Sequence, residues 1–219
     1  MIKVYYFLRS EDELTLRQDA IDMLSKSLPA IDAALLSVAI KDAIPERPAK
    51  LSGVLELWFR GMEDADICSD FSPSVLFTKP VETASMLMGM ERVVMRTPAF
   101  YETDGVKGIY AFRRKEDMPV KEFQHYWWHG HGPIAAQTES ATCYVQCHVA
   151  QESYTNGSPT FDGVTELYWP DMPAALSALG SRQMIEDQSN DARNFVDIES
   201  VDLMMAKQNM IIPPWRENL

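Results

Sequence analysis

The feature that most constrains the fold of this chain is an internal repeat. When the sequence is shifted by 104 positions, residues 2–31 lie over residues 106–135 without a gap, and four pairs are identical: Lys3 and Lys107, Tyr6 and Tyr110, Arg9 and Arg113, Pro29 and Pro133. A slightly larger shift brings Gly53–Trp58 over Gly163–Tyr168, where four of the six residues are identical. Two matching blocks in the same order indicate a duplicated structural unit.

Hydrophobic periodicity predicts the same order of elements in both halves: strand, helix, strand, strand, helix, strand. In the first half we expect strands at about Lys3–Leu8, Leu35–Ile40, Val54–Phe59 and Glu91–Met95, with helices at Leu16–Ser27 and after Gly61. In the second half we expect strands at about Gly108–Arg113, Thr142–Ala150, Gly163–Trp169 and Ile198–Ala206, with helices at Pro119–His131 and Met172–Leu179. Residues Ala99–Gly105 form the predicted linker, and Ile211–Trp215 are expected to lack regular structure.

This order of elements is that of a ferredoxin-like unit, β-α-β-β-α-β. One such unit leaves one face of its sheet bare, whereas two units can close face to face around a shared interior. We therefore predict an α+β fold in which two tandem ferredoxin-like repeats form an α/β barrel within one chain. The N-terminal repeat would cover residues 1–98 in a degenerate form, and the C-terminal repeat would cover residues 106–210.

Composition and charge exclude several classes of function. A net charge of −12 argues against binding to nucleic acid or to an anionic membrane surface, and no apolar run has the length of a membrane span. The apolar start, Met1–Phe7, is typical of a first strand and not of a signal peptide. The odd set of Cys68, Cys143 and Cys147 fits reduced thiols. We expect a cytoplasmic protein.

Aromatic and histidine residues are concentrated in the segment Phe123–Pro133. On a helix, Phe123, Trp127 and His131 share one face, so this histidine is expected to point inward, where its pKa can be tuned. Pro133 is expected to kink or end the helix near His131. Two interpretations remain open, namely a functional histidine in a site and a buried, hydrogen-bonded structural histidine.

Strand alternation predicts which side chains face a shared interior. Along the second strand of the C-terminal half, Cys143, Val145, Cys147 and Val149 are expected to pack under helices, and Tyr144, Gln146 and His148 to lie on the other face. Glu166 and Tyr168 are expected on that same non-helical face. We therefore predict an interior cavity lined by His131, Tyr144, His148, Glu166 and Tyr168; the alternative is a solvated face.

The sequence resembles the EthD family of the dimeric α/β-barrel superfamily. The residues that carry the resemblance are Phe123 and Trp127, then His131-Gly132-Pro133, Tyr144–Val149, Phe161–Tyr168 and Asp191–Asp197. The match extends over residues 105–206. In the first half Ser27 stands in place of the histidine and Ser52 in place of the aspartate before Gly53, although Glu56 is kept. The chain thus looks like a fused two-repeat form with its full set of polar groups in the second half.

The resemblance implies more about architecture than about reaction. EthD-like proteins are associated with the degradation of ethers and aromatic compounds and with fungal polyketide steps that resemble decarboxylation or dehydration. Related barrels include cofactor-free oxygenases, isomerases, polyketide cyclases and haem-dependent enzymes. Most of them act on hydrophobic, often aromatic, ligands, and the fold alone cannot select among these reactions.

The candidate residues suit proton transfer. A neutral His131 can accept a proton at neutral pH, Tyr144 can donate a hydrogen bond to a developing enolate or phenolate, and Glu166 can orient the imidazole or act as the acid. We assign catalytic roles to these three residues. Aromatic walls suit a flat substrate, and we assign substrate binding to Trp127, Trp128, Gln146, His148 and Tyr168.

No cofactor or metal is expected. His129 and His131 are two residues apart and therefore do not share a helix face, and no carboxylate stands at a zinc-type spacing. Haem held by a histidine occurs among related barrels, but no second feature of this sequence supports it. Glycine-rich loops of the nucleotide- or phosphate-binding type are absent from the sequence.

We therefore expect a cofactor-independent enzyme that acts on a small hydrophobic aromatic or polyketide-like compound in a catabolic or secondary-metabolic pathway. The expected reaction is that of a lyase, such as decarboxylation, dehydration or a related proton transfer. The alternatives are a cofactor-free monooxygenase of the same superfamily and a non-catalytic protein that binds small molecules. Whether the chain forms a homodimer is left open.

Overall fold

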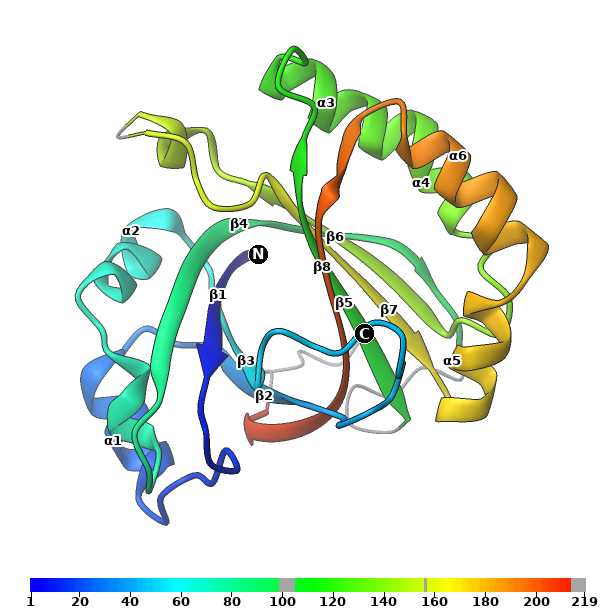
Figure 1. The fold of residues 1–219 in the computed structure, drawn as a ribbon. Helices are drawn as coiled ribbons and strands as arrows, with labels where there is room; N and C mark the ends of the chain where they lie inside the picture. The colour runs from blue at the N-terminus through cyan, green and yellow to red at the C-terminus, as the bar shows by residue number, and fades with distance from the viewer. Residues whose placement is uncertain (99–104, 156, 214–219) are drawn as a thin grey trace.

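Eight strands form a closed barrel in the computed structural model, which describes residues 1–98, 105–155 and 157–213 (Figure 1). Around the barrel the strands follow the order β1-β3-β2-β8-β5-β7-β6-β4, and β4 closes the circle by pairing with β1. All neighbouring pairs are antiparallel. The prediction of a mixed α/β barrel within one chain is confirmed.

The N-terminal half contributes four strands and several short helices. Its strands are β1 (Ile2–Arg9), β2 (Ala33–Ala39), β3 (Gly53–Phe59) and β4 (Glu82–Arg96). Its helices are α1 (Ala20–Ser27) and α2 (Met62–Ala65), followed by 3-10 turns at Asp66–Ser69 and Pro73–Leu76. These helices lie together on one side of the barrel (Figure 1).

The C-terminal half has the same number of strands and more helix. Its strands are β5 (Val106–Arg114), β6 (Cys143–Val149), β7 (Gly163–Trp169) and β8 (Val196–Ile212). The main helices are α3 (Val120–Tyr126), α4 (Gly132–Ala135), α5 (Met172–Leu179) and α6 (Ser189–Ala192), with π-helical segments at Trp127–His131 and Gln183–Gln188 and a 3-10 turn at Gln151–Tyr154. The helices α3, α4, α5 and α6 cover the side of the barrel opposite α1 and α2 (Figure 1).

The two halves pair their strands in the same way. The order β4-β1-β3-β2 in the first half recurs as β8-β5-β7-β6 in the second, and the halves meet at β2–β8 and at β4–β6. Tyr6 pairs with Leu55 across β1 and β3, and Tyr110 pairs with Thr165 across β5 and β7. Because the two sequence shifts relate these same residues, the internal repeat corresponds to one strand register used twice.

Alternation along the strands separates a barrel interior from two helix-covered faces. Apolar side chains of both halves, among them Tyr5, Val54 and Ile109, meet inside the barrel. On the outer face of the first half, a continuous apolar cluster joins the sheet to Leu24 of α1. On the outer face of the second half, two clusters contain Phe123 of α3, and Ala175 and Ala178 of α5.

Several predicted boundaries differ from the structure. The first helix begins at Ala20 and not at Leu16, which instead forms an isolated bridge with Phe77. Strands β4 and β8 are much longer than predicted, and β8 includes Ile211 and Ile212, where no regular structure was expected. Helix α5 matches its prediction, and its N-cap Asp171 accepts a hydrogen bond from the Ala174 N–H at 2.8 Å. Of the predicted linker, residues 99–104 lie outside the described residues.

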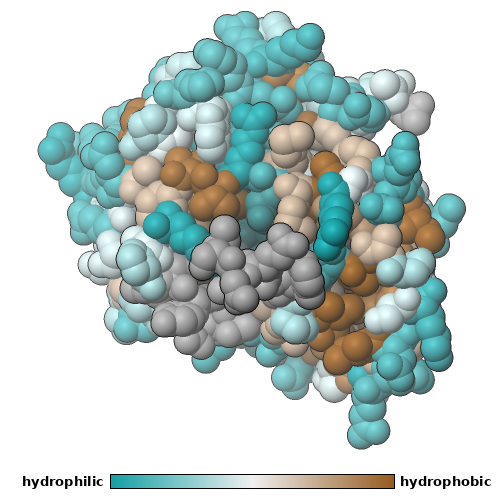
Figure 2. Space-filling model, turned by 180° about the vertical axis from the view of Figure 1, so that it is seen from behind, coloured by the Kyte–Doolittle hydropathy of each residue, from teal (hydrophilic) through white to brown (hydrophobic). Residues whose placement is uncertain are grey.

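The outer surface is mostly hydrophilic around the rim of the face shown in Figure 2, and apolar residues gather on it in separate patches. Among the described residues, no helix is both long enough and apolar enough to cross a membrane.

Candidate active site

The centre of the barrel holds four fully buried charges. Lys3 and Lys107, which the internal repeat relates, project inward beside Glu56 and Glu166. Lys107 lies 2.6 Å from Glu56 and 3.0 Å from Glu166, and Lys3 lies 2.8 Å from Glu56 and also pairs with Glu166. Each lysine therefore bridges a glutamate of its own half and one of the other half.

Glu166 has no free oxygen to offer a substrate. Tyr5 donates a hydrogen bond to one carboxylate oxygen at 2.5 Å, and Tyr168 donates to the other at 2.7 Å. Burial alone would raise the pKa of Glu166, but the charges of Lys107 and Lys3 outweigh this effect and hold the pKa below its ordinary value. The position of Glu166 and Tyr168 fits an ion-pair network that ties the two halves together.

Tyr144, Gln146 and His148 lie on the face of β6 opposite the predicted one. The Gln146 amide donates hydrogen bonds to the Trp127 carbonyl at 2.9 Å and to the Tyr144 hydroxyl at 2.7 Å. Its oxygen lies 2.9 Å from Nε2 of His148, whose ring stacks on Trp127 with 4.5 Å between centroids. This polar row therefore lies beneath the helix and not inside the barrel.

The predicted single cavity is wrong, because its residues lie on two sides of the sheet. His131, Tyr144 and His148 are on the helix side, whereas Glu166 and Tyr168 are inside the barrel, where Cys143, Val145, Cys147 and Val149 also point. Every residue of β6 is buried. The alternation of polar and apolar residues along β6 therefore does not indicate which face of the strand meets the helices. Because alternate side chains point to opposite faces, a wrong choice of face misplaces Tyr144, Gln146 and His148 together.

The polar row on β6 is electrically neutral at pH 7. Burial, together with the nearby charge of Arg92, lowers the pKa of His148 to about 3. Burial also raises the pKa of Tyr144 to about 12. Trp128 stands edge-on to His148 at 6.3 Å, and the Arg92 guanidinium lies 5.3 Å from a Trp128 ring centroid. Gln146 and His148 thus both contact Trp127.

The helix that carries His131 was predicted to kink or end near that residue. It does not end there: it widens into a π-helical turn at Trp127–His131 and continues to Ala135. The Gly132 N–H donates to the Trp127 carbonyl, five residues earlier. Pro133 has no N–H, so the regular ladder must be interrupted near it; π turns inside helices frequently mark functional sites. The His129 ring lies against the His125 ring, with 4.5 Å between centroids and a tilt of 44° between the ring planes.

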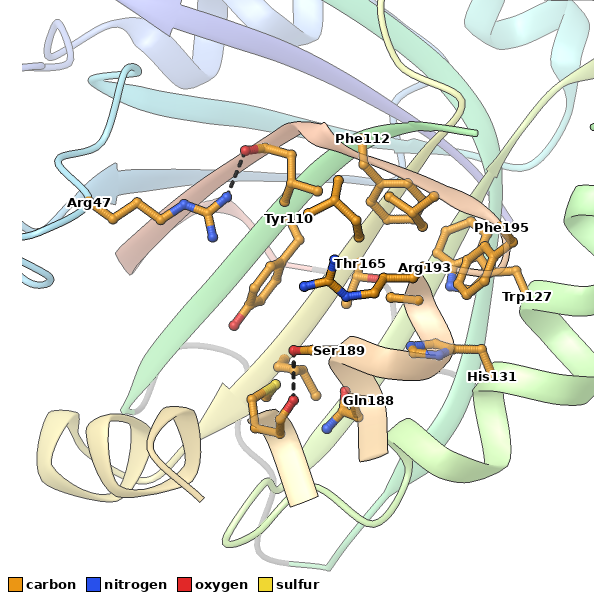
Figure 3. A pocket seen from close by; sticks show the side chains of 16 residues that line it. Arg47, Tyr110, Phe112, Trp127, His131, Thr165, Gln188, Ser189, Arg193 and Phe195 are labelled. Carbon is orange, nitrogen blue, oxygen red and sulfur yellow. Dashed lines mark hydrogen bonds between the residues drawn. The ribbon is translucent and has the colours of Figure 1, made fainter. Parts of the chain in front are cut away.

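A cavity of about 230 Å³ lies between the C-terminal sheet and its covering helices (Figure 3). Its apolar wall is formed by residues that include Phe112, Trp127, Leu167, Met184, Ala192, Phe195 and Val196. Its polar groups are Arg47, Tyr110, His131, Thr165, Gln188, Ser189 and Arg193. An apolar pocket with a few convergent polar groups is the usual form of a small-molecule site.

His131 is the candidate acid–base group of this cavity. Its Nδ1 lies 2.8 Å from a carboxylate oxygen of Asp191 at α6, and Asp191 also accepts a hydrogen bond from Tyr126 at 2.7 Å. Burial lowers the pKa of His131, and Asp191 opposes this effect only in part. With a proton fixed on Nδ1, the neutral ring leaves Nε2 as a base, and Nε2 has no hydrogen-bond partner among the described residues.

Sequence reasoning found two of the residues that line the cavity, Trp127 and His131, and missed the others. Tyr110 appeared only as a partner of Tyr6 in the repeat, although a tyrosine on a helix-covered face is a signal for a buried hydroxyl. Arg47 comes from the loop between β2 and β3, and nothing in its local sequence indicates that it reaches the other half. Among the described residues, no group of three or more His, Cys, Asp or Glu side chains could hold a metal ion.

Residues 115–199 match the model of the EthD domain. The C-terminal half carries an EthD domain. The matched range includes His131, Trp127 and Asp191, so the hydrogen-bonded pair of His131 and Asp191 lies within the EthD domain. Tyr110 and Arg47 lie outside the matched range, and the cavity is therefore completed by residues that precede the EthD domain.

Solved structures share the fold of the whole chain and not only of its EthD domain. An anthrone oxidase-like protein has 11% identity and a TM-score of 0.59, covering 100% of this chain and 96% of its own. A chlorite dismutase mutant from Candidatus Nitrospira defluvii has 7% identity and a TM-score of 0.55, covering 96% and 91%. A provisionally named monooxygenase from Lactobacillus acidophilus NCFM has 13% identity and a TM-score of 0.51, covering 96% and 95%. No curated protein matches the sequence.

Proposed function

We propose that this protein is an enzyme that binds a small, flat, largely apolar compound in the C-terminal cavity and removes a proton from it with His131. The observation that carries the proposal is the neutral His131 ring, held at Nδ1 by Asp191 and lining an apolar cavity with an unoccupied Nε2. A positioned base of this kind typically contributes a factor of about 10²–10⁴ in rate.

The neighbours of His131 fit this role. Trp127 forms one wall and is fixed from behind by Gln146 and His148. Phe195 lies 5.0 Å from the imidazole, between ring centroids, and helps keep water from it. Tyr144 supports this wall through Gln146, so we assign Tyr144, Gln146 and His148 to positioning. Glu166 and Tyr168 are assigned to the barrel core.

The two halves are proposed to be tandem ferredoxin-like repeats, with residues 1–98 as the degenerate copy and residues 106–210 as the functional one. The repeated strand order and the shared register of β1–β3 and β5–β7 support this division. In this arrangement the first half acts as the permanent barrel partner of the second.

Proton removal is the first step of more than one overall reaction. A lyase or isomerase would return the proton elsewhere or expel a group, whereas a cofactor-free monooxygenase would let the carbanion react with molecular oxygen. The fold shared with proteins described as a monooxygenase and as anthrone oxidase-like keeps the oxygenase as the second candidate. A protein that only sequesters its ligand is the third candidate, and it needs no base at Nε2.

Anthrone provides a direct test because its benzylic C–H is acidic. We expect the protein to accelerate exchange of this proton with deuterated water under argon, measured by NMR, and His131→Gln to lose most of the acceleration. Oxygen uptake in air then separates an oxygenase from a lyase or isomerase. If the wild type binds anthrone and related flat phenols but accelerates neither exchange nor oxygen uptake, the enzymatic proposal is wrong and sequestration is supported.

A further inference from the structure

The charged side chains among the described lining residues of the cavity are both cationic, and the carboxylate of Asp191, which contacts His131, is not part of that lining. Among the described residues that line it, Arg47 and Arg193 contribute guanidinium groups, and none is an aspartate or glutamate. The whole chain, in contrast, carries a net charge of −12. The cavity therefore presents a local positive potential in an acidic protein, which favours an anionic ligand.

Both arginines retain donors that a ligand could use. The Arg47 side chain is exposed and donates one hydrogen bond to the Val201 carbonyl at 2.8 Å. This bond holds the loop between β2 and β3 against β8. Arg193 is exposed and forms no hydrogen bond or ion pair with the described residues. A guanidinium has five N–H donors, so both groups can still bind a carboxylate or phenolate.

Tyr110 supplies a second, independent sign of a missing polar partner. Its hydroxyl is buried and has no hydrogen-bond partner among the described residues. Burial raises the pKa of Tyr110, so the group is a neutral donor at pH 7. A buried hydroxyl without a partner is costly, and a ligand oxygen in the cavity would remove this cost.

The positions of these polar groups predict how a ligand would be oriented in the cavity. Figure 3 shows Arg47 and His131 at opposite ends, with Arg193 and Tyr110 between them. A ligand whose anionic group faces Arg47 and Arg193 would place its apolar body along Phe112 and Trp127, with its far end near His131.

We propose that the substrate of this cavity is an anionic aromatic compound, a carboxylate or a phenolate, whose charged group is bound by Arg47 and Arg193 with Tyr110 as a hydrogen-bond donor. The proposal rests on the proposed function, because it names the substrate class of the same cavity. It also makes Arg47, a residue of the N-terminal half, a specificity determinant for a site in the C-terminal half.

Two probes of equal size test the charge preference. The first is 2-naphthoate, and the second is its neutral counterpart 2-naphthamide; dissociation constants are measured by calorimetry at low ionic strength. We expect naphthoate to bind about tenfold or more tightly than naphthamide, a modest factor because both arginines are exposed. In Arg47→Gln/Arg193→Gln the ratio should fall to near one, mainly through weaker naphthoate binding.

The matched control is Arg182→Gln, which removes an exposed arginine that pairs with Glu186 and does not line the cavity. This control should keep the wild-type ratio. Equal binding of both probes by the wild type, or an unchanged ratio in the double variant, would overturn the anionic substrate class but leave the cavity as a binding site. Failure of both probes to bind would count against this inference and against the proposed function together.

Discussion

The two helix-covered faces of the barrel are built on the same strand register but differ in their contents. In the first half, the pair Tyr6 and Leu55 belongs to a continuous apolar core, and the Tyr6 hydroxyl donates to the Cys68 carbonyl at 2.6 Å. In the second half, the equivalent pair Tyr110 and Thr165 lines a cavity, and the Tyr110 hydroxyl has no partner among the described residues.

This difference shows how one barrel can have one face that is packed for stability and another face that leaves room for a ligand. A filled face contributes burial, whereas a hollow face gives up part of that burial to hold a ligand. Two of the repeat-related positions differ in the way this exchange needs: Thr165 stands where the first half has Leu55, and His131 stands where the sequence repeat has Ser27. The barrel core, with matching lysines and glutamates, is kept in both halves.

The largest contrast is expected at the histidine position. His131→Ala should lower the rate of anthrone proton exchange by about 10²–10⁴-fold, because it removes the base without disturbing the sheet. Ser27→Ala, at the repeat-related and exposed position, should leave the rate unchanged. The measurement is exchange by NMR, with thermal unfolding of each variant as the control for folding. Equal rates in wild type and His131→Ala would remove His131 from the mechanism.

Equivalent substitutions in the two halves should have similar effects on stability at the four buried charges of the barrel centre, Lys3, Lys107, Glu56 and Glu166. Glu56→Gln and Glu166→Gln each leave two buried lysines with one carboxylate removed, and each should lower the free energy of unfolding by about 3–5 kcal/mol. Urea unfolding measures both. A cost confined to Glu166 would mean that the first half does not share the barrel core in the way its contacts indicate.

The filled and hollow faces should respond differently to loss of side-chain volume. Leu55→Ala creates a void in a packed core and should cost about 2–5 kcal/mol of unfolding free energy, whereas Thr165→Ala enlarges an existing cavity and should cost less than about 1 kcal/mol. Urea unfolding of the two variants gives the comparison. Similar costs would show that the second face is as tightly packed as the first.

The sequence was sufficient for the barrel but not for the site. Repeat and alternation located β7 and α5 to the residue, because their boundaries coincide with turn and cap signals such as Asp171. They predicted the wrong face for the polar side chains of β6, because both faces of this strand are buried and polarity does not distinguish between them. His131 was found because its helix is amphipathic, whereas Arg47 reaches the cavity through a tertiary contact that no local pattern encodes.

The acid–base pair should also set the pH dependence. Burial lowers the pKa of His131 below 6.5, so the neutral base is present at pH 7, and the rate should fall about tenfold per pH unit only below that lowered value. Asp191 raises the pKa, so Asp191→Asn should move the acid limb to still lower pH. Rate–pH profiles of anthrone exchange test both statements. An acid limb above 6.5, or one moved upward in the variant, would contradict the assigned environment.

The smallest contrast is also the most direct test of the cavity, because it changes one oxygen atom in each half. Tyr6→Phe removes a donor from the buried Cys68 carbonyl and should lower the free energy of unfolding by about 1–2 kcal/mol. Tyr110→Phe removes a buried hydroxyl that has no partner among the described residues, so it should be neutral or slightly stabilising in the free protein.

When a ligand is bound, loss of the Tyr110 hydroxyl should become the more costly of the two substitutions. With 2-naphthoate bound, the Tyr110 hydroxyl gains an acceptor, so Tyr110→Phe should bind naphthoate more weakly than wild type while Tyr6→Phe binds it equally well. Thermal unfolding of both variants with and without naphthoate gives all four comparisons. If Tyr110→Phe is as destabilising in the free protein as Tyr6→Phe, the hydroxyl already has a partner, and the second face differs less from the first than its cavity implies.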